Sequence, residues 1–431
     1  MQLGAANSAG LQPDQGPPLS IPASFFSLAP LSLVAAGLVL LLGPELTSRW
    51  TPTLMAVTHI GTLGLLGSVM LGALYQMVPV LAGQPVPLVR LGHGVFVAWV
   101  VGAVALIGAL MRPSSTAFTV AAVALGCALI AFLLPMAVAL GRATSRAAGA
   151  HRVEVHGMRA AVLALGVTGL YGVYMASGWA QLALPANRMA LIGGHVTIGL
   201  LGWIGVLLTS VSTKIIPMFY LTAEFPRRPA LVGLGVLVAS VFGAALAPLL
   251  GAEPRTVAWL ALPAAALVWL VHPAIVLRML ADRRRKRVDM SVRFWQAGLC
   301  VGPLIVTTAI ASLVSDDARW PLLFGWFAVF GWGGLIVHGM LTRIGPFLVW
   351  FHRYAPIVGH TKVPPMRQLF PASRSRPALL LHGLGVAIGA LGLGLNQPIL
   401  VRLAGGALVG SGVVLAYAMA RMATRSSPRK E

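Results

Sequence analysis

Twelve long apolar stretches are the feature that most limits how this chain can fold. Each comes close to or exceeds the ~20 residues that a helix needs to cross a bilayer. The chain is 58% apolar and only 10% charged. We therefore predict an all-α polytopic membrane protein with 12 transmembrane helices, which excludes a soluble protein. The predicted spans are 24–43, 53–81, 89–111, 116–140, 158–184, 188–219, 228–250, 255–280, 294–314, 319–349, 377–395 and 397–421.

The formal net charge of +21 is explained by topology. With the N-terminus inside, all but six of the 31 Lys and Arg residues fall on the cytoplasmic side or at its edge; the exceptions are Arg49, Arg112, Arg188, Arg255, Arg319 and Arg402. This positive-inside bias predicts a multi-pass protein of a bacterial-type cytoplasmic membrane, with both termini cytoplasmic. These basic residues are expected to interact with the anionic lipids of the bilayer. Nucleic acid is excluded, because no basic stripe carries interleaved aromatics.

One short pattern occurs three times, and we call each copy a cassette. A glycine precedes a proline by 12 residues, and a polar residue precedes the same proline by three. The glycines are Gly67, Gly205 and Gly334, the prolines Pro79, Pro217 and Pro346, and the polar residues Gln76, Lys214 and Arg343. An internal repeat of this kind predicts three pseudo-symmetric groups of four helices, at about 24–157, 158–293 and 294–421. They form a single membrane domain, 24–421, between a disordered cytoplasmic tail, 1–23, and a basic cytoplasmic tail, 422–431.

The cassette glycines have two interpretations. In lipid, small residues let helix backbones approach closely, so the glycines are expected to form helix-packing surfaces. They could also let a flat cofactor lie against the helix. The proline is expected to end or kink its span, because it lacks an N–H group. Lys214 and Arg343 are expected to extend to the lipid headgroups.

Three histidines lie on the cassette helices, and ionisable residues inside a membrane are functional candidates. His59 and His195 precede their prolines by 20 and 22 residues, which places both near the outer surface. His338 precedes its proline by 8 residues and is therefore deeper than His59 by about 18 Å. His59 and His195 can form a level pair, whereas His338 can pair with His93 or His382 at the inner side.

Carboxylates and cysteines argue against several classes of protein. All ten Asp and Glu residues, Glu154 among them, are expected in tails or loops. Proton-coupled transporters and pumps usually keep a carboxylate in the membrane, so both classes are disfavoured. A hydrolase is also disfavoured, because the sequence shows neither paired carboxylates nor a Ser/His/Asp arrangement. Cys127 and Cys300 lie within spans, so no disulfide framework or thiolate metal site is expected.

Twelve spans in three groups, with a histidine on each of spans 2, 6 and 10, resemble subunit I of the haem–copper oxidases and nitric oxide reductases. In that family a pseudo-symmetric ring of helices encloses haems and a copper. The cassettes around His59, His195 and Pro346 are also similar to NnrS-type nitric-oxide-response membrane proteins. By this resemblance His59 matches the span-2 ligand of the low-spin haem, and His195 matches the span-6 histidine that binds copper.

The chain also departs from the oxidase pattern. The residue four positions after His195 is Gly199 rather than the family's tyrosine, and the paired histidines of spans 7 and 10 are missing. A complete haem–copper centre cannot be built, so a terminal oxidase is not expected.

The cofactors still compatible with the sequence are one haem b or one copper ion, bound near the outer face. The candidate cofactor-binding residues are His59, His195 and His338, and the candidate metal ligands are His195 and His59. Such a protein would serve electron transfer, NO response or metal/haem handling, with a redox protein or other membrane subunits as partners. The alternative is a cofactor-free membrane carrier or an assembly partner on the same scaffold. Whether the protein is an enzyme stays open.

Overall fold

The computed structural model describes residues 16–43, 48–143, 149, 151–180, 186–284, 289–361 and 363–424. Within these ranges the chain is helical, and the single isolated bridge, between Val358 and Thr361, belongs to no strand. Most of the predicted tails, 1–15 and 425–431, lies outside the described residues, as do 285–287 of the basic run before span 9.

The helices follow one another along the chain with short connections. They are α1 Ser20–Leu41, α2 Pro52–His59, η2 Ile60–Gly67, α3 Ser68–Ala82, α4 Leu91–Met111, α5 Ser115–Gly141, α7 Arg152–Ala180, α8 Arg188–Val196, η3 Thr197–Gly205, α9 Val206–Tyr220, α10 Arg227–Leu246, η4 Ala247–Leu250, α11 Pro254–Ala266, η5 Leu267–Val271, α12 His272–Ala281, α13 Met290–Cys300, α14 Gly302–Val314, α15 Arg319–Trp326, η6 Phe327–Gly334, α16 Leu335–Arg353, η7 Ala355–Ile357, η8 Met366–Gln368, α17 Ala372–Gly394 and α18 Pro398–Ala423.

Among the described residues, twelve continuous helices are long and apolar enough to cross a membrane, which confirms the predicted all-α polytopic fold. Each coincides with a predicted span to within a few residues. The largest difference is at span 5, which runs over Arg152–Gly178 instead of 158–184. The grouping of these spans into three copies of four stays a prediction.

The earlier start of span 5 corrects one expectation. Glu154 lies in the first turn of α7, inside the span, and is buried rather than in a loop. The hydroxyl of Thr213 on α9 donates to Glu154 Oε1 at 2.7 Å. A carboxylate is favourable at this position, because the N-terminus of a helix carries partial positive charge.

Local sequence explains where several helices begin. Pro52, Pro254 and Pro398 each lie in the first turn of their helix, where a missing N–H costs nothing. Ser114 and Asp289 precede α5 and α13, and their side chains accept hydrogen bonds from backbone N–H groups of the first turn. These signals define helix ends, whereas the apolar composition defines helix length.

The cassette prolines lie inside helices. Helix α3 ends three residues after Pro79, and α9 ends three residues after Pro217, as expected of a residue that weakens helix continuation. Helix α16 continues for seven residues beyond Pro346. The guanidinium of Arg343 on this helix contacts Asp289 at 3.3 Å, so it makes an ion pair.

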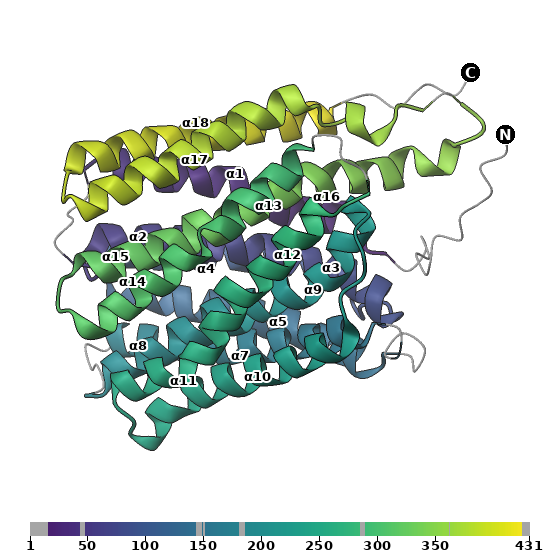
Figure 1. Ribbon diagram of the computed structural model, residues 1–431. Helices are drawn as coiled ribbons and strands as arrows, with labels where there is room; N and C mark the ends of the chain where they lie inside the picture. The colour runs from purple at the N-terminus through teal and green to yellow at the C-terminus, as the bar shows by residue number, and fades with distance from the viewer. Residues whose placement is uncertain are drawn as a thin grey trace. The chain divides into compact units, whose positions relative to one another are not determined.

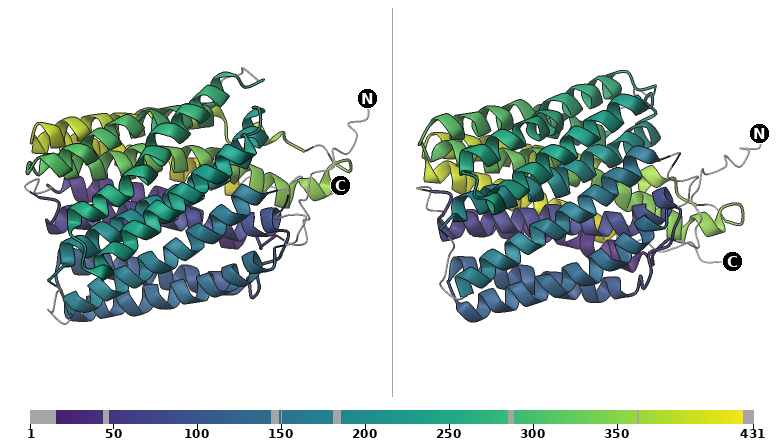
Figure 2. Two further views of the ribbon diagram at one scale, coloured as in Figure 1. Left: turned by 60° about the horizontal axis from the view of Figure 1, so that its bottom comes forward. Right: turned by 90° about the horizontal axis from the view of Figure 1, so that it is seen from below.

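The chain divides into two compact units, each drawn from several parts of the sequence. Unit 1 comprises Met1–Pro22, Met70–Ala105 and Ser114–Val268, and unit 2 comprises Ala23–Val69, Leu106–Pro113 and Trp269–Glu431. In unit 1, α10 packs against α11 and α5 against α7 (Figure 1). In unit 2, α17 and α18 run side by side along their length, and they stay adjacent in both views of Figure 2.

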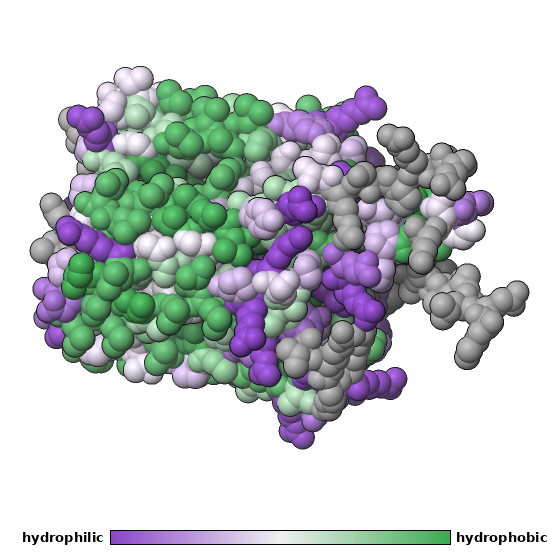
Figure 3. Space-filling view, turned by 90° about the horizontal axis from the view of Figure 1, so that it is seen from above, coloured by the Kyte–Doolittle hydropathy of each residue, from purple (hydrophilic) through white to green (hydrophobic). Residues whose placement is uncertain are grey.

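The surface matches a bilayer environment. On the face shown in Figure 3, hydrophobic residues form a broad central band, and hydrophilic residues gather toward its two ends. Large apolar side chains such as Leu170, Val232 and Leu380 are exposed in mid-helix, at 72%, 67% and 55%. Such exposure would be costly in water and is favourable against lipid chains.

Candidate functional site

The three cassette helices share an unusual backbone geometry. Each changes from α- to π-helical hydrogen bonding in its middle, over Ile60–Gly67, Thr197–Gly205 and Phe327–Gly334. In all three, the π-helical segment ends at the cassette glycine. The repeat in the sequence therefore extends to the local conformation. π-helical segments are rare and occur frequently at functional sites, so they direct attention to these helices.

In unit 2, the small residues of two cassettes form a close helix contact. A Cβ atom at Gly61 on η2 would lie 2.4 Å from Cγ1 of Val329 on η6, and one at Gly333 on η6 would lie 2.9 Å from Cδ1 of Leu66 on η2. Neither position has room for a side chain without movement. At these glycines the helix-packing interpretation holds, because the space that a flat cofactor would need is already filled by the facing helix.

A pair of histidines lies inside unit 2, next to the same η6 segment. The Nδ1 atoms of His338 on α16 and His382 on α17 are 3.1 Å apart. The other nitrogen of His382, Nε2, lies 3.0 Å from the carbonyl oxygen of Phe330. Both histidines are fully buried, with 0% exposure. The sequence left His338 with two potential partners, and the structure brings it together with His382.

The hydrogen bonds fix where the protons lie in the neutral pair. A carbonyl oxygen only accepts, so Nε2 of His382 carries a proton and donates to Phe330. The Nδ1 atom of His382 then has the lone pair and accepts from the Nδ1–H group of His338. Consequently, Nε2 of His338 carries a lone pair, and this buried atom has no hydrogen-bond partner among the described residues.

The surroundings of His338 hold its ring in one orientation. The ring of Phe294 on α13 stacks on it, with centroids 4.6 Å apart and an angle of 29° between the planes. On the side of His382, a Cβ atom at Gly334 would lie 3.3 Å from Nε2, so the cassette glycine leaves space for the imidazole. The unpartnered nitrogen therefore belongs to a rigidly packed side chain.

His59 lies at the end of α2, directly before the π-helical segment η2. Its Nδ1–H group donates to the carbonyl oxygen of Met55, one turn earlier, at 2.8 Å. The remaining nitrogen, Nε2, therefore carries the lone pair. The residue is half-buried. This tautomer, held by a backbone carbonyl, is the one that metal-binding histidines usually adopt.

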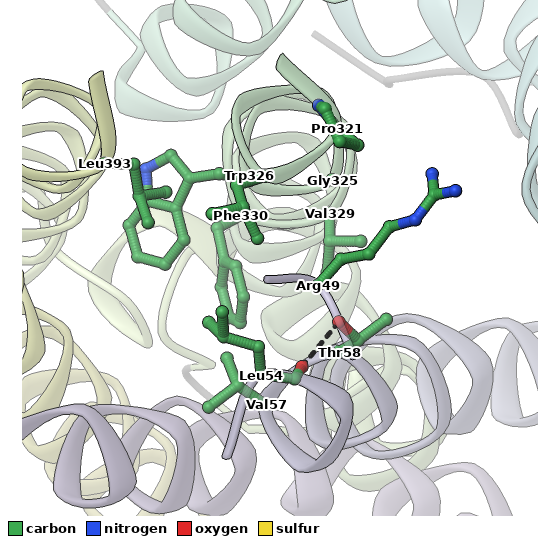
Figure 4. Close-up of a pocket in the computed structure, with 11 residues that line it drawn as sticks. Arg49, Leu54, Val57, Thr58, Pro321, Gly325, Trp326, Val329, Phe330 and Leu393 are labelled. Atoms are coloured by element: carbon green, nitrogen blue, oxygen red, sulfur yellow. Dashed lines mark hydrogen bonds between the residues drawn. The ribbon is translucent and has the colours of Figure 1, made fainter. Parts of the chain in front are cut away.

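A small groove is lined in part by α2, and His59 is not among its lining residues (Figure 4). Leu54, Val57 and Thr58 form one wall, and Trp326 and Phe330 on α15 and η6 form another. Its volume is about 60 Å³. The Thr58 hydroxyl is bonded to the Leu54 carbonyl at 2.8 Å, and the indole N–H of Trp326 to the Val386 carbonyl at 2.9 Å. The walls are therefore largely apolar, and these polar atoms are already paired.

Arg49 gives the groove a cationic edge. Its side chain lines the groove, and in Figure 4 the guanidinium points away from Trp326 and Phe330. The guanidinium carbon lies 4.6 Å from the centre of the Trp50 ring, which is within range of a cation–π contact. This end of the groove can meet a negatively charged group.

His195 lies in unit 1, whereas His59, His338 and His382 lie in unit 2. It is half-buried at the end of α8, and its Cε1 atom is 3.6 Å from the place that a Cβ at Gly172 would occupy. The level pair of His59 and His195 stays a prediction. The sequence reasoning missed the carbonyl of Phe330 as a partner of His382, because a carbonyl turned toward a neighbouring helix leaves no signal in the sequence.

The donor set limits which metal groups fit. Among the described residues, no group of three or more His, Cys, Asp and Glu side chains is arranged to hold a metal ion. A haem needs only one or two axial ligands, and a single histidine such as His59 can provide one.

No protein-family model and no curated protein sequence matches this chain. Function is therefore inferred from the site geometry and the membrane fold.

Proposed function

We propose that this integral-membrane protein binds one b-type haem near its outer face, with His59 as an axial ligand, for electron transfer, NO response or haem handling. The observation that carries the proposal is the hydrogen bond from His59 Nδ1 to the Met55 carbonyl. It leaves the Nε2 lone pair as the free ligand atom and holds the ring in one orientation. A haem bound there would supply a one-electron redox couple and a position for a diatomic gas.

A groove lies on the same helix as His59, although His59 does not line it. Its walls are apolar and aromatic, and Arg49 at its edge offers a charge partner for an acidic group of the ligand. The groove is small, at about 60 Å³. A porphyrin bound at Nε2 of His59 would therefore need space that this groove does not provide.

Copper is the second candidate. A single copper ion at His59 or His195 would need further ligands, and among the described residues no group of three or more His, Cys, Asp and Glu side chains is arranged to provide them. Haem is preferred because one axial histidine is enough to hold it. The remaining alternative, a cofactor-free carrier or an assembly partner, is supported by the small size of the groove.

Optical spectra and metal analysis of the purified protein test the proposal. We would record oxidised and dithionite-reduced spectra in mild detergent for the wild type, His59→Ala and His352→Ala. His352 is a matched control, because its Nδ1 donates to the carbonyl of Leu348, one turn earlier, at 3.0 Å, near the other end of a cassette helix.

A Soret band that His59→Ala weakens and His352→Ala preserves supports haem at His59. Stoichiometric copper without a Soret band selects the copper variant of the proposal. A colourless, metal-free protein, or full cofactor content in His59→Ala, rejects the site and favours a carrier or an assembly partner.

A further inference from the structure

We propose that His338 and His382 form a one-proton site inside the membrane, which takes up a proton at the Nε2 atom of His338. This inference goes beyond the proposed haem site and does not depend on it. It rests on the unpartnered lone pair at Nε2, on the 3.1 Å bond between the two imidazoles, and on their complete burial.

The enclosure of His338 selects a very small ligand. The residue has no exposed surface, and Phe294 covers one face of its ring at 4.6 Å. A porphyrin cannot reach Nε2 without opening the packing that buries His338, and no group of three or more His, Cys, Asp and Glu side chains among the described residues is arranged to hold a metal ion. A proton needs only the lone pair itself.

Proton uptake can spread over both rings. The proton bonds to the Nε2 lone pair of His338, and the Nδ1 proton of His338 moves along the hydrogen bond to Nδ1 of His382. His382 then donates from both nitrogens, to His338 and to the carbonyl of Phe330. The pair has gained one proton and one positive charge, and release reverses the two steps.

Two neighbours stabilise the charged pair. The bond from His382 Nε2 to the Phe330 carbonyl, 3.0 Å long, becomes charge-assisted and therefore stronger. The stacked ring of Phe294 lies close enough for a cation–π contribution if the charge is on His338. Among the described residues no carboxylate is bonded to the pair, so the protonated state is costly and suits a proton in transit better than a permanent ion pair.

Within the described part of unit 2, the hydrogen bonds of the two imidazoles are to each other and to the Phe330 carbonyl. The titratable residues on the elements packed against α16 and α17 are Arg293 and Cys300 on α13, Arg319 on α15, Arg343, His352 and Arg353 on α16, Arg367 on η8, Arg374 and Arg376 on α17, and Arg402, Tyr417 and Arg421 on α18. The direct partners of the pair are therefore the two rings and the Phe330 carbonyl, in a fully buried position.

The pair offers an alternative to the intramembrane carboxylate of other proton-conducting proteins. Its location beside the π-helical segment η6 is consistent with that role. Phe330 belongs to η6, so a change in the hydrogen bonding of this segment would change how strongly His382 holds its proton.

Nitrogen NMR of the full chain with ¹⁵N-labelled histidine tests the proposal, because lone-pair and protonated ring nitrogens have different chemical shifts. The variants are His338→Gln, His382→Gln and, as control, His352→Gln on the same helix. Each neutral histidine contributes one lone-pair nitrogen, and we expect the signal of His338 Nε2 to disappear in His338→Gln and to stay in His352→Gln. Lowering the pH should convert it to N–H, with the His382 signals shifting at the same pH, and His382→Gln should change that pH.

The proposal is overturned if the lone-pair nitrogen persists over the whole pH range in which circular dichroism shows intact helices. It is also overturned if a chelator, rather than pH, changes the signal, because a bound metal then occupies Nε2. Should a glutamine variant fail to fold, the wild type still decides: two imidazoles that titrate together support the pair, and two that titrate separately reject it.

Discussion

Replacing Gly61 with alanine should destabilise unit 2, because the added methyl group has no space. Its Cβ atom would lie 2.4 Å from Cγ1 of Val329, and real Cβ contacts essentially never fall below 3.0 Å, so the two helices must separate by at least 0.6 Å or Val329 must move. Overpacking of this kind costs about 1–3 kcal/mol. Alanine in place of glycine gains up to ~1 kcal/mol from helix propensity, which partly hides the cost.

Gly383→Ala is the matched control, because a Cβ at Gly383 on α17 meets nothing within 4 Å. Both variants gain the propensity term, so the difference between them isolates the packing cost, and we expect Gly61→Ala to be less stable than Gly383→Ala by about 1–3 kcal/mol. Unfolding in mixed micelles with increasing SDS, followed by circular dichroism, measures that difference. Equal stability of the two variants would show that η2 and η6 are not in close contact at this position.

Three further predictions concern other parts of the fold. Trp326→Phe should cost about 1–2 kcal/mol in the same unfolding assay, because a buried carbonyl of α17 loses its donor, whereas Trp259→Phe at an exposed site should change little. Hydrogen bonds from Arg319 lower the pKa of Asp317, so at this carboxyl the folded state binds fewer protons than the unfolded state. The stabilisation of the folded state by this carboxylate should be present above pH ~4 and be lost as the pH falls through the lower folded pKa. It should be absent at every pH in Asp317→Asn, and a series of unfolding curves at different pH values measures it. In a version without the native cysteines, Ser315→Cys should react with a membrane-impermeant maleimide added to intact cells, and labelling only after permeabilisation would reverse the proposed topology.

Much of the fold could be predicted because a bilayer imposes strong local rules. A long apolar run must form a helix, since its backbone groups have no water to bond with. The spans therefore follow from composition and agree with the structure to within a few residues. Span 5 was the exception, because the polar residues Glu154, His156 and Arg159 obscure the first turns of a helix that begins at Arg152.

The cassettes were also visible in the sequence, but their conformation was not. Glycines at fixed distances from a proline identify a repeat, yet nothing in their spacing distinguishes α- from π-helical hydrogen bonding. Likewise, the sequence could not decide whether a glycine adjoins a helix or a cofactor. At Gly61 and Gly333 the facing helix decides it, because Val329 and Leu66 fill the space.

The sequence by itself determined which residues lie in the membrane, and so which histidines are costly enough to suggest a function. Tertiary structure alone decided their chemistry. His338 and His382 are 44 residues apart on different helices, and only the packing of α16 against α17 places their nitrogens in contact. The physical reason is that span formation depends on local hydrophobicity, whereas the proton and the lone pair of an imidazole are assigned by whichever donor or acceptor the fold brings to each nitrogen.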